Sequence, residues 1–158
     1  MDTFYSTVTT LCFTLIGLWW AVLQLRWHEW VNVPARRRTA HSVFLAFLVP
    51  GIMSLGAQIA PELPLMWRLV FVAGSIGGIV ATFFLARAAA AGGFFLRVGR
   101  WLMLLLYVFV LVTALVPDIY RAFGLTGLQG EALWVTILVL LGVMLAWEAV
   151  MEPSQHTN

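Results

Sequence analysis

The residues best suited to chemistry lie along the first apolar stretch of this 158-residue chain. Small or polar residues recur there every three or four positions, which places them on one face of an α-helix. Threonine hydroxyls can replace part of an ion's hydration shell, so this pattern predicts the wall of a water-filled path. Helices also use small residues and hydroxyls to pack closely in lipid, so a packing seam is the alternative interpretation. The full pattern consists of Thr3, Thr7, Thr10, Thr14, Gly17, Ala21, Gln24 and His28. We call its middle part, from Thr7 to Gln24, the Thr/Gly stripe.

A proline and a glycine, Pro50 and Gly51, stand in the middle of the second apolar stretch. Proline removes one hydrogen bond from a helix and bends it, so the pair predicts a hinge that frees the carbonyl of Ala46. A freed carbonyl at that depth could coordinate a cation, or the proline could simply bend the helix. A broken helix is also a feature of compact transporters.

The third apolar stretch carries closely spaced glycines, Gly74, Gly77 and Gly78. Glycines at such spacings allow two helices to approach, so we expect them to serve helix packing. Arg68 begins the same stretch beside Trp67. We expect Arg68 either to reach lipid phosphates or to attract anions at an outer mouth.

Glu148 is the charged residue that stands out near the end of the last apolar stretch. A carboxylate near a helix C-terminus opposes the helix dipole and therefore needs compensation. One interpretation is a salt bridge or a water contact, with Arg87, Arg97 or Arg100 close by. The other is a proton or cation site at the inner entrance of a path through the membrane. Arg68 and Glu148 are therefore our two candidates for charged residues at the entrances of such a path.

Motifs typical of enzymes do not stand out in the sequence. It shows no nucleophile–base pair, nucleotide-binding loop or paired carboxylates within an apolar stretch. The single cysteine, Cys12, excludes an intrachain disulfide and a cysteine metal cluster. His28 and His41 do not have the spacing of a metal site. We therefore expect no enzymatic activity, no cofactor, no metal and no nucleic-acid partner.

Composition identifies the elements that must position these residues. Hydrophobic residues make up 62% of the chain and charged residues 10%, which is typical of a membrane protein rather than a soluble domain. The apolar runs do not alternate as the strands of a membrane β-barrel do. We predict an all-α, polytopic membrane protein in which residues 1–152 form a single transmembrane domain and 153–158 a disordered tail. The predicted spans are residues 4–25, 39–60, 65–86, 98–117 and 132–151.

The last two spans are almost purely apolar. We therefore expect them to face lipid, while the first three spans form the interior of the protein. Residues 118–131 form the longest segment between spans. We expect an amphipathic turn there or, alternatively, an extension of the fourth span beyond Pro117.

Arginine placement predicts the orientation. Seven of the nine basic residues flank one side of the spans, namely Arg26, Arg36, Arg37, Arg38, Arg87, Arg97 and Arg100, and only Arg68 and Arg121 flank the other. The positive-inside rule then predicts an outer N-terminus and a cytoplasmic C-terminus in the plasma or inner membrane. Trp27, Trp30, Trp101 and Trp147 are expected at the inner interface. The run Arg36, Arg37 and Arg38 predicts an anchor for anionic lipids or a docking site for a soluble partner.

Taken together, these patterns favour a homo-oligomeric ion channel whose first helix lines a shared path. The alternative is a non-conducting scaffold or accessory subunit that uses its small-residue faces to bind another membrane protein. A compact transporter, supported by Pro50 and Gly51 alone, comes third.

Overall fold

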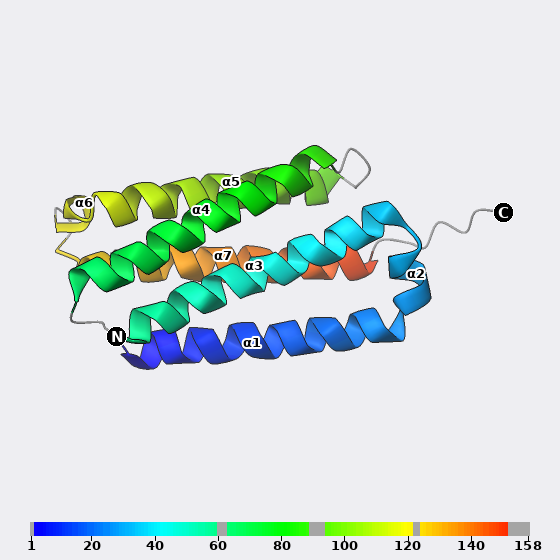
Figure 1. Ribbon diagram of the computed structural model, residues 1–158, viewed down its shortest axis with the longest axis horizontal. Helices are drawn as coiled ribbons and strands as arrows, with labels where there is room; N and C mark the ends of the chain where they lie inside the picture. The colour runs from blue at the N-terminus through cyan, green and yellow to red at the C-terminus, as the bar shows by residue number, and fades with distance from the viewer. Residues whose placement is uncertain (1, 60–62, 89–93, 122–123, 152–158) are drawn as a thin grey trace.

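The computed structural model describes residues 2–59, 63–88, 94–121 and 124–151. All regular structure in these ranges is helical, which confirms the all-α part of the predicted fold class (Figure 1). Two short helices, α2 (Trp27–Val31) and α6 (Asp118–Arg121), accompany the long ones. The predicted tail, residues 153–158, lies outside the described residues. Five helices are long and apolar enough to cross a membrane: α1 (Asp2–Leu25), α3 (Pro34–Ile59), α4 (Pro64–Ala88), α5 (Phe94–Leu115) and α7 (Gly127–Met151).

Local sequence signals explain where the long helices begin and end. Pro34 and Pro64 occupy the first positions of α3 and α4, where a missing N–H costs nothing. Thr126 and Gln129 form a capping box: the Gln129 side chain accepts the Thr126 N–H at 2.9 Å, and the Thr126 hydroxyl accepts the Gln129 N–H at 3.3 Å. Helix α7 therefore begins at Gly127, five residues before the predicted start.

Helix α5 ends at Leu115, and Pro117 separates it from α6. The alternative in which the fourth span continues past Pro117 is thus wrong, because a proline interrupts the helix there. Gly124, with φ of 69°, turns the chain from α6 toward α7.

Helix α3 occupies the centre of the bundle and packs against α1, α4 and α7, while α5 packs against α4 and α7. In the apolar segment of α3, 50% of the residues are buried, and in that of α5 44% are buried. In the apolar segment of α1 only 17% of the residues are buried. The expectation that the first three spans form the interior and the last two face lipid is therefore wrong. Lipid tails are as apolar as leucine, so a purely apolar sequence does not distinguish a lipid-facing helix from a central one.

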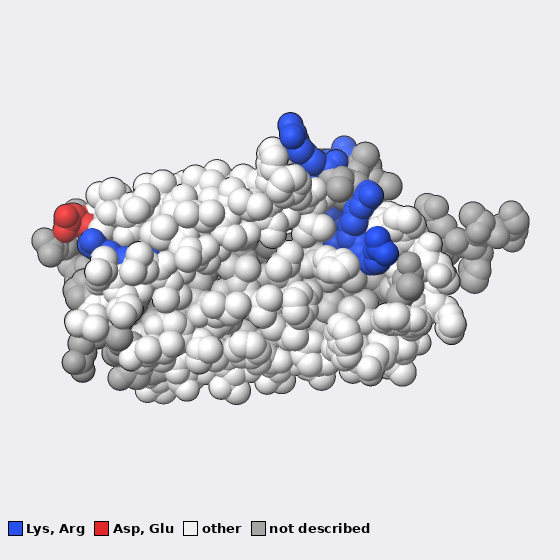
Figure 2. Space-filling view, in the orientation of Figure 1, with Lys and Arg blue, Asp and Glu red and all other residues white. Residues whose placement is uncertain are grey.

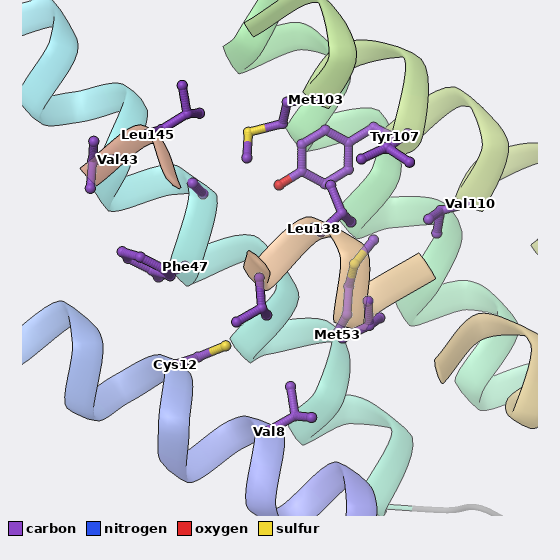
Figure 3. Close-up of a cluster of buried hydrophobic side chains, with 14 of the residues drawn as sticks. Val8, Cys12, Val43, Phe47, Met53, Met103, Tyr107, Val110, Leu138 and Leu145 are labelled. Carbon is purple, nitrogen blue, oxygen red and sulfur yellow. The ribbon is translucent and has the colours of Figure 1, made fainter. Parts of the chain in front are cut away.

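The bundle interior is filled by apolar side chains from α1, α3, α5 and α7 (Figure 3). Cys12, Met53, Tyr107 and Leu138 are all fully or almost fully buried within it. Helices α3 and α4 approach closely, as do α4 and α5, because glycines stand at the contacts. A methyl group at Gly74 would lie 2.7 Å from Met53 Cγ.

A methyl group at Gly78 would likewise lie 2.7 Å from the Tyr107 ring. Gly77, in contrast, is exposed, and a methyl group there would meet nothing within 4 Å.

The predicted hinge lies within an unbroken helix. Helix α3 runs from Pro34 to Ile59 with the buried Pro50 inside it. A Cβ at Gly51 would lie 3.1 Å from the Cβ of Cys12, so Gly51 allows α1 to pack closely on α3. The structure thus places Pro50 and Gly51 at a helix contact and does not show the interruption that a transporter of the broken-helix type would need.

In the described helices, the charged residues lie toward the two ends of the bundle. On the face shown in Figure 2, arginine side chains gather at one end, acidic and further basic atoms lie at the other, and the surface between them is uncharged. We call the end where α1 finishes and α3 begins the Arg-rich end, and the end where α7 begins the opposite end (Figure 1).

Candidate functional site

The Thr/Gly stripe lies on the outward face of α1. Every one of its residues is exposed, and a Cβ at Gly17 would meet nothing within 4 Å. The opposite face of α1, with Tyr5, Cys12 and Trp19, is the one buried in the bundle. The stripe is therefore not a seam between helices of one chain, and what it faces lies outside the single molecule.

The threonines of the stripe use their hydroxyl protons within α1. Thr7 donates to the Thr3 carbonyl at 2.7 Å, Thr10 to the Ser6 carbonyl at 3.0 Å and Thr14 to the Thr10 carbonyl at 2.8 Å. Each hydroxyl oxygen keeps its lone pairs for a further partner. The exposed face of α1 consequently offers acceptors rather than donors at three positions.

A second polar site, which the sequence patterns did not reveal, surrounds Glu131 at the opposite end. Glu131 is fully buried in the first turns of α7, and neither carboxyl oxygen has a partner in good hydrogen-bond geometry, although the Thr113 hydroxyl of α5 lies beside the carboxyl group. A carboxylate charge buried without a partner carries a large desolvation cost. This makes Glu131 the most unusual polar group in the described part of the chain.

Hydroxyl groups from three other helices lie around Glu131, and two of them donate to backbone carbonyls. The Tyr5 phenol of α1 donates to the Leu128 carbonyl at 2.6 Å, and the Thr113 hydroxyl of α5 donates to the Phe109 carbonyl at 2.8 Å. The Tyr120 oxygen of α6 accepts the Trp134 indole N–H at 2.7 Å. Burial raises the pKa of Tyr120 above its usual value, so its phenol stays neutral.

One local signal could have revealed this site. The Thr126 and Gln129 capping box places the start of α7 at Gly127, so Glu131 falls inside the helix and not in the preceding loop. Its orientation toward Tyr5 of α1, 126 positions earlier in the chain, is a tertiary property that local patterns do not contain.

Arg100 is a further buried charged group, at the Arg-rich end. Its side chain is 3% exposed and donates a hydrogen bond to the Thr39 hydroxyl of α3 at 3.0 Å. Helix α5 begins at Phe94, four residues before the predicted span, so Arg100 lies in the second turn of the helix and inside the bundle. It joins α5 to α3.

The remaining predicted residues are distributed between the two ends. Arg68 lies at the opposite end with its guanidinium 5.8 Å from the centre of the Trp67 ring. Glu148 is half-buried near the end of α7, at the Arg-rich end. The structure therefore brings neither residue onto the Thr/Gly stripe.

The run of three arginines opens α3 at the Arg-rich end. Arg37 and Arg38 are exposed, whereas Arg36 is half-buried.

No protein-family model, curated protein or solved structure matches the chain. The fold itself defines the class: five helices long and apolar enough for a multi-pass membrane protein. In the described part of the chain, no group of three or more histidine, cysteine or acidic residues is placed to hold a metal ion.

Proposed function

We propose that the protein is a homo-oligomeric ion channel in which α1 of each copy lines a shared path. The observation that supports this most is the outward exposure of the whole Thr/Gly stripe on α1. The amide of Gln24 and the remaining lone pairs of the threonine hydroxyls are solvated better by a water-filled axis between copies than by lipid tails.

The interior of one copy is filled mainly by apolar side chains, and its buried hydroxyl and carboxyl groups, such as Ser54, Tyr107 and Glu131, belong to different helices instead of following one helix face. Phe47, Met53, Val110 and Leu138 fill the space between the helices and are fully or almost fully buried. An ion in such an interior would lose its hydration without receiving a continuous row of oxygen ligands. A path between copies is therefore more consistent with the packing than a path through one copy.

The hydrogen bonds of the stripe favour cations as the conducted species. Thr7, Thr10 and Thr14 donate their protons to backbone carbonyls, so the oxygen lone pairs are what they can present to a passing ion. Gln24 adds an exposed amide oxygen near the Arg-rich end, and no residue of the stripe is basic. Oxygen acceptors coordinate cations and not anions.

The proposed orientation follows from the charge at the two ends. Seven of the nine arginines belong to the Arg-rich end, which we assign to the cytoplasm, with the N-terminus outside. The membrane would then be the plasma or inner membrane. Arg36, Arg37 and Arg38 would lie at its cytoplasmic surface, within reach of anionic lipids.

Ion flux into liposomes tests the proposal. The purified protein is expected to pass monovalent cations, and Thr14→Leu is expected to lower the flux severalfold because it replaces an oxygen by a bulky apolar group. Thr136→Leu is the matched control, since Thr136 is also exposed and also donates to the carbonyl four residues earlier, at 2.8 Å, but belongs to α7. Equal effects of the two substitutions would contradict the assignment of the path to α1.

The second candidate is a non-conducting scaffold or accessory subunit. The exposed Gly17 and Ala21 favour it, because small residues on an outer helix face allow another membrane helix to approach. A protein that is monomeric in detergent and passes no ions in liposomes would favour this function over the channel.

A further inference from the structure

A pocket of about 470 Å³ lies at the Arg-rich end, between α1, α2 and α3. This volume falls within the roughly 300–1,000 Å³ of small-molecule sites in proteins. We call it the aromatic pocket, because most of its walls are indole and phenyl rings. The lining residues that matter here are Trp20, Trp27, Trp30, Phe44, Arg37 and His41.

Buried contacts hold the inner wall of the aromatic pocket. Helix α1 ends at Leu25, and the short α2 follows it and packs on α3, which brings Trp30 against Trp19. The two indole rings meet edge to face with centres 5.5 Å apart, and Trp19 donates to the Ala40 carbonyl at 3.2 Å. This wall is therefore part of the core of the bundle.

The outer wall is open to the surroundings. Trp20 and Trp27 are 54% and 52% exposed, so their rings are accessible from the surface at the level where α1 ends. In the proposed orientation this level is the boundary between lipid tails and headgroups. Tryptophan is enriched at that boundary because its ring is apolar and its N–H is polar.

The polar groups of the pocket match an anion. Arg37 is exposed and carries the positive charge, and the His41 ring is oriented by a 2.7 Å hydrogen bond between Nδ1 and the Arg37 carbonyl. Trp30 is 4% exposed, and its indole N–H has no acceptor among the described residues. The described lining holds no acidic side chain.

We propose that the aromatic pocket binds one anionic phospholipid. The Arg37 guanidinium pairs with the phosphate, and the indole and phenyl rings pack against the glycerol and the first part of the acyl chains. Both halves of the ligand are needed, because a mostly apolar pocket alone would not select a charged headgroup. The proposal does not depend on ion conduction, since it concerns a different face of the molecule from the Thr/Gly stripe.

Arg36 and Arg38 make this proposal distinct from a general attraction to charged membranes. They flank Arg37 in the same helical turn, but they do not line the aromatic pocket. A diffuse electrostatic anchor would depend on the three arginines to a similar degree. A specific pocket would depend on Arg37 far more than on its two neighbours.

Native mass spectrometry of the full-length protein in detergent tests the pocket. Phosphatidylglycerol is expected to bind at least several times more tightly than phosphatidylcholine with the same acyl chains. Arg37→Gln is expected to weaken phosphatidylglycerol binding about tenfold, the loss typical of one charge-assisted hydrogen bond, while Arg36→Gln and Arg38→Gln change it less than about threefold. Trp27→Ala, at an exposed position, is expected to weaken binding of both lipids.

Three results would overturn the proposal. Similar losses for the three arginine variants would indicate diffuse attraction, and equal binding of the two lipids would indicate an apolar groove without headgroup selection. Effective competition by soluble glycerol phosphate would indicate a small phosphate ligand in place of a lipid. Thermal unfolding of each variant in the same detergent verifies that lost binding reflects the pocket and not the fold, and ion flux plays no part in the readout.

Discussion

At the scale of the residue, Glu131 and Gly78 show how single residues affect the packing of this bundle. Glu131 places a carboxyl group in the interior with no partner in good hydrogen-bond geometry, and Gly78 leaves room for the Tyr107 ring. Neither role follows from residue type alone. A glutamate at a helix start is usually solvated, and Gly77, one position before Gly78, faces outward.

Replacement of Glu131 by glutamine should preserve or increase the stability of the fold. Glutamine keeps the shape of the side chain and cannot ionise, so it fits an interior that disfavours charge, whereas Glu131→Ala leaves a cavity and should destabilise by about 2 kcal/mol or more. Thermal unfolding in detergent measures both. Glu148→Gln, at a half-buried position of the same helix, is the control.

The opposite outcome would be equally informative. If Glu131→Gln lowered the unfolding temperature by several degrees while Glu148→Gln did not, the carboxyl group would have to be stabilised by a partner such as a bound water or cation. Glu131 would then be a paired acid, and its carboxyl group would contribute to the stability of the fold.

Two adjacent glycines of α4 provide a second test at this scale. A methyl group at Gly78 would lie 2.7 Å from the Tyr107 ring, so Gly78→Ala should destabilise the bundle by about 1–3 kcal/mol through overpacking. Gly77→Ala meets nothing within 4 Å and should leave stability unchanged or slightly improved. Thermal unfolding of the two variants side by side tests this difference. If the two variants had similar stability, the α4–α5 contact would not be as close as described.

At the scale of the element, the apolar stretches predict five long helices, but their assignment to centre or periphery requires the fold. Helix α1 has the most polar stripe and yet is the most exposed of the five, because only 17% of the residues in its apolar segment are buried. Helix α5 carries few polar residues and is 44% buried. The reason is that α1 contacts the bundle with its apolar face and leaves the stripe outside.

The exposed stripe predicts that α1 mediates self-association. Gly17→Leu adds a bulky side chain where the single chain has open space, so it should leave the fold of each copy intact and disrupt contacts between copies. Gly77→Leu, on the exposed face of α4, is a matched control with equally open surroundings. Light scattering of the protein–detergent complex measures the oligomeric state.

The expected result is a smaller assembly for Gly17→Leu and no change for Gly77→Leu. The reverse pattern would assign the contact between copies to α4. It would also remove the main support for a path lined by α1.

At the scale of the whole molecule, the sorting of charge to the two ends predicts how the protein crosses the membrane. Asn32 is exposed at the Arg-rich end and Leu63 is exposed at the opposite end. The one native cysteine, Cys12, is fully buried and should not react with a water-soluble reagent. New cysteines at the two exposed positions can therefore be labelled selectively.

Labelling of intact cells with a membrane-impermeant maleimide tests the orientation. Leu63→Cys should react from outside, whereas Asn32→Cys should react only after the cells are opened, because the Arg-rich end is expected in the cytoplasm. The unsubstituted protein should remain unlabelled in both conditions. Labelling of Asn32→Cys in intact cells would reverse the proposed orientation.

The all-helical class, the five long apolar helices and the separation of charge from their middle sections can all be predicted from the order of residues along the chain. These properties follow from hydropathy and residue placement along short stretches of chain, so they need no knowledge of distant contacts. The capping box at Thr126 and the prolines that open α3 and α4 are local in the same sense, and they correct the predicted starts of those helices.

Which face of each helix is internal, in contrast, depends on contacts between distant parts of the chain. It buries Glu131 and Arg100, turns the Thr/Gly stripe outward and forms the aromatic pocket from three separate helices. The physical reason is that a lipid tail and a protein interior are almost equally apolar. Hydropathy therefore identifies a helix that can cross the membrane but does not identify its neighbours, which are chosen by the shapes of the packing side chains.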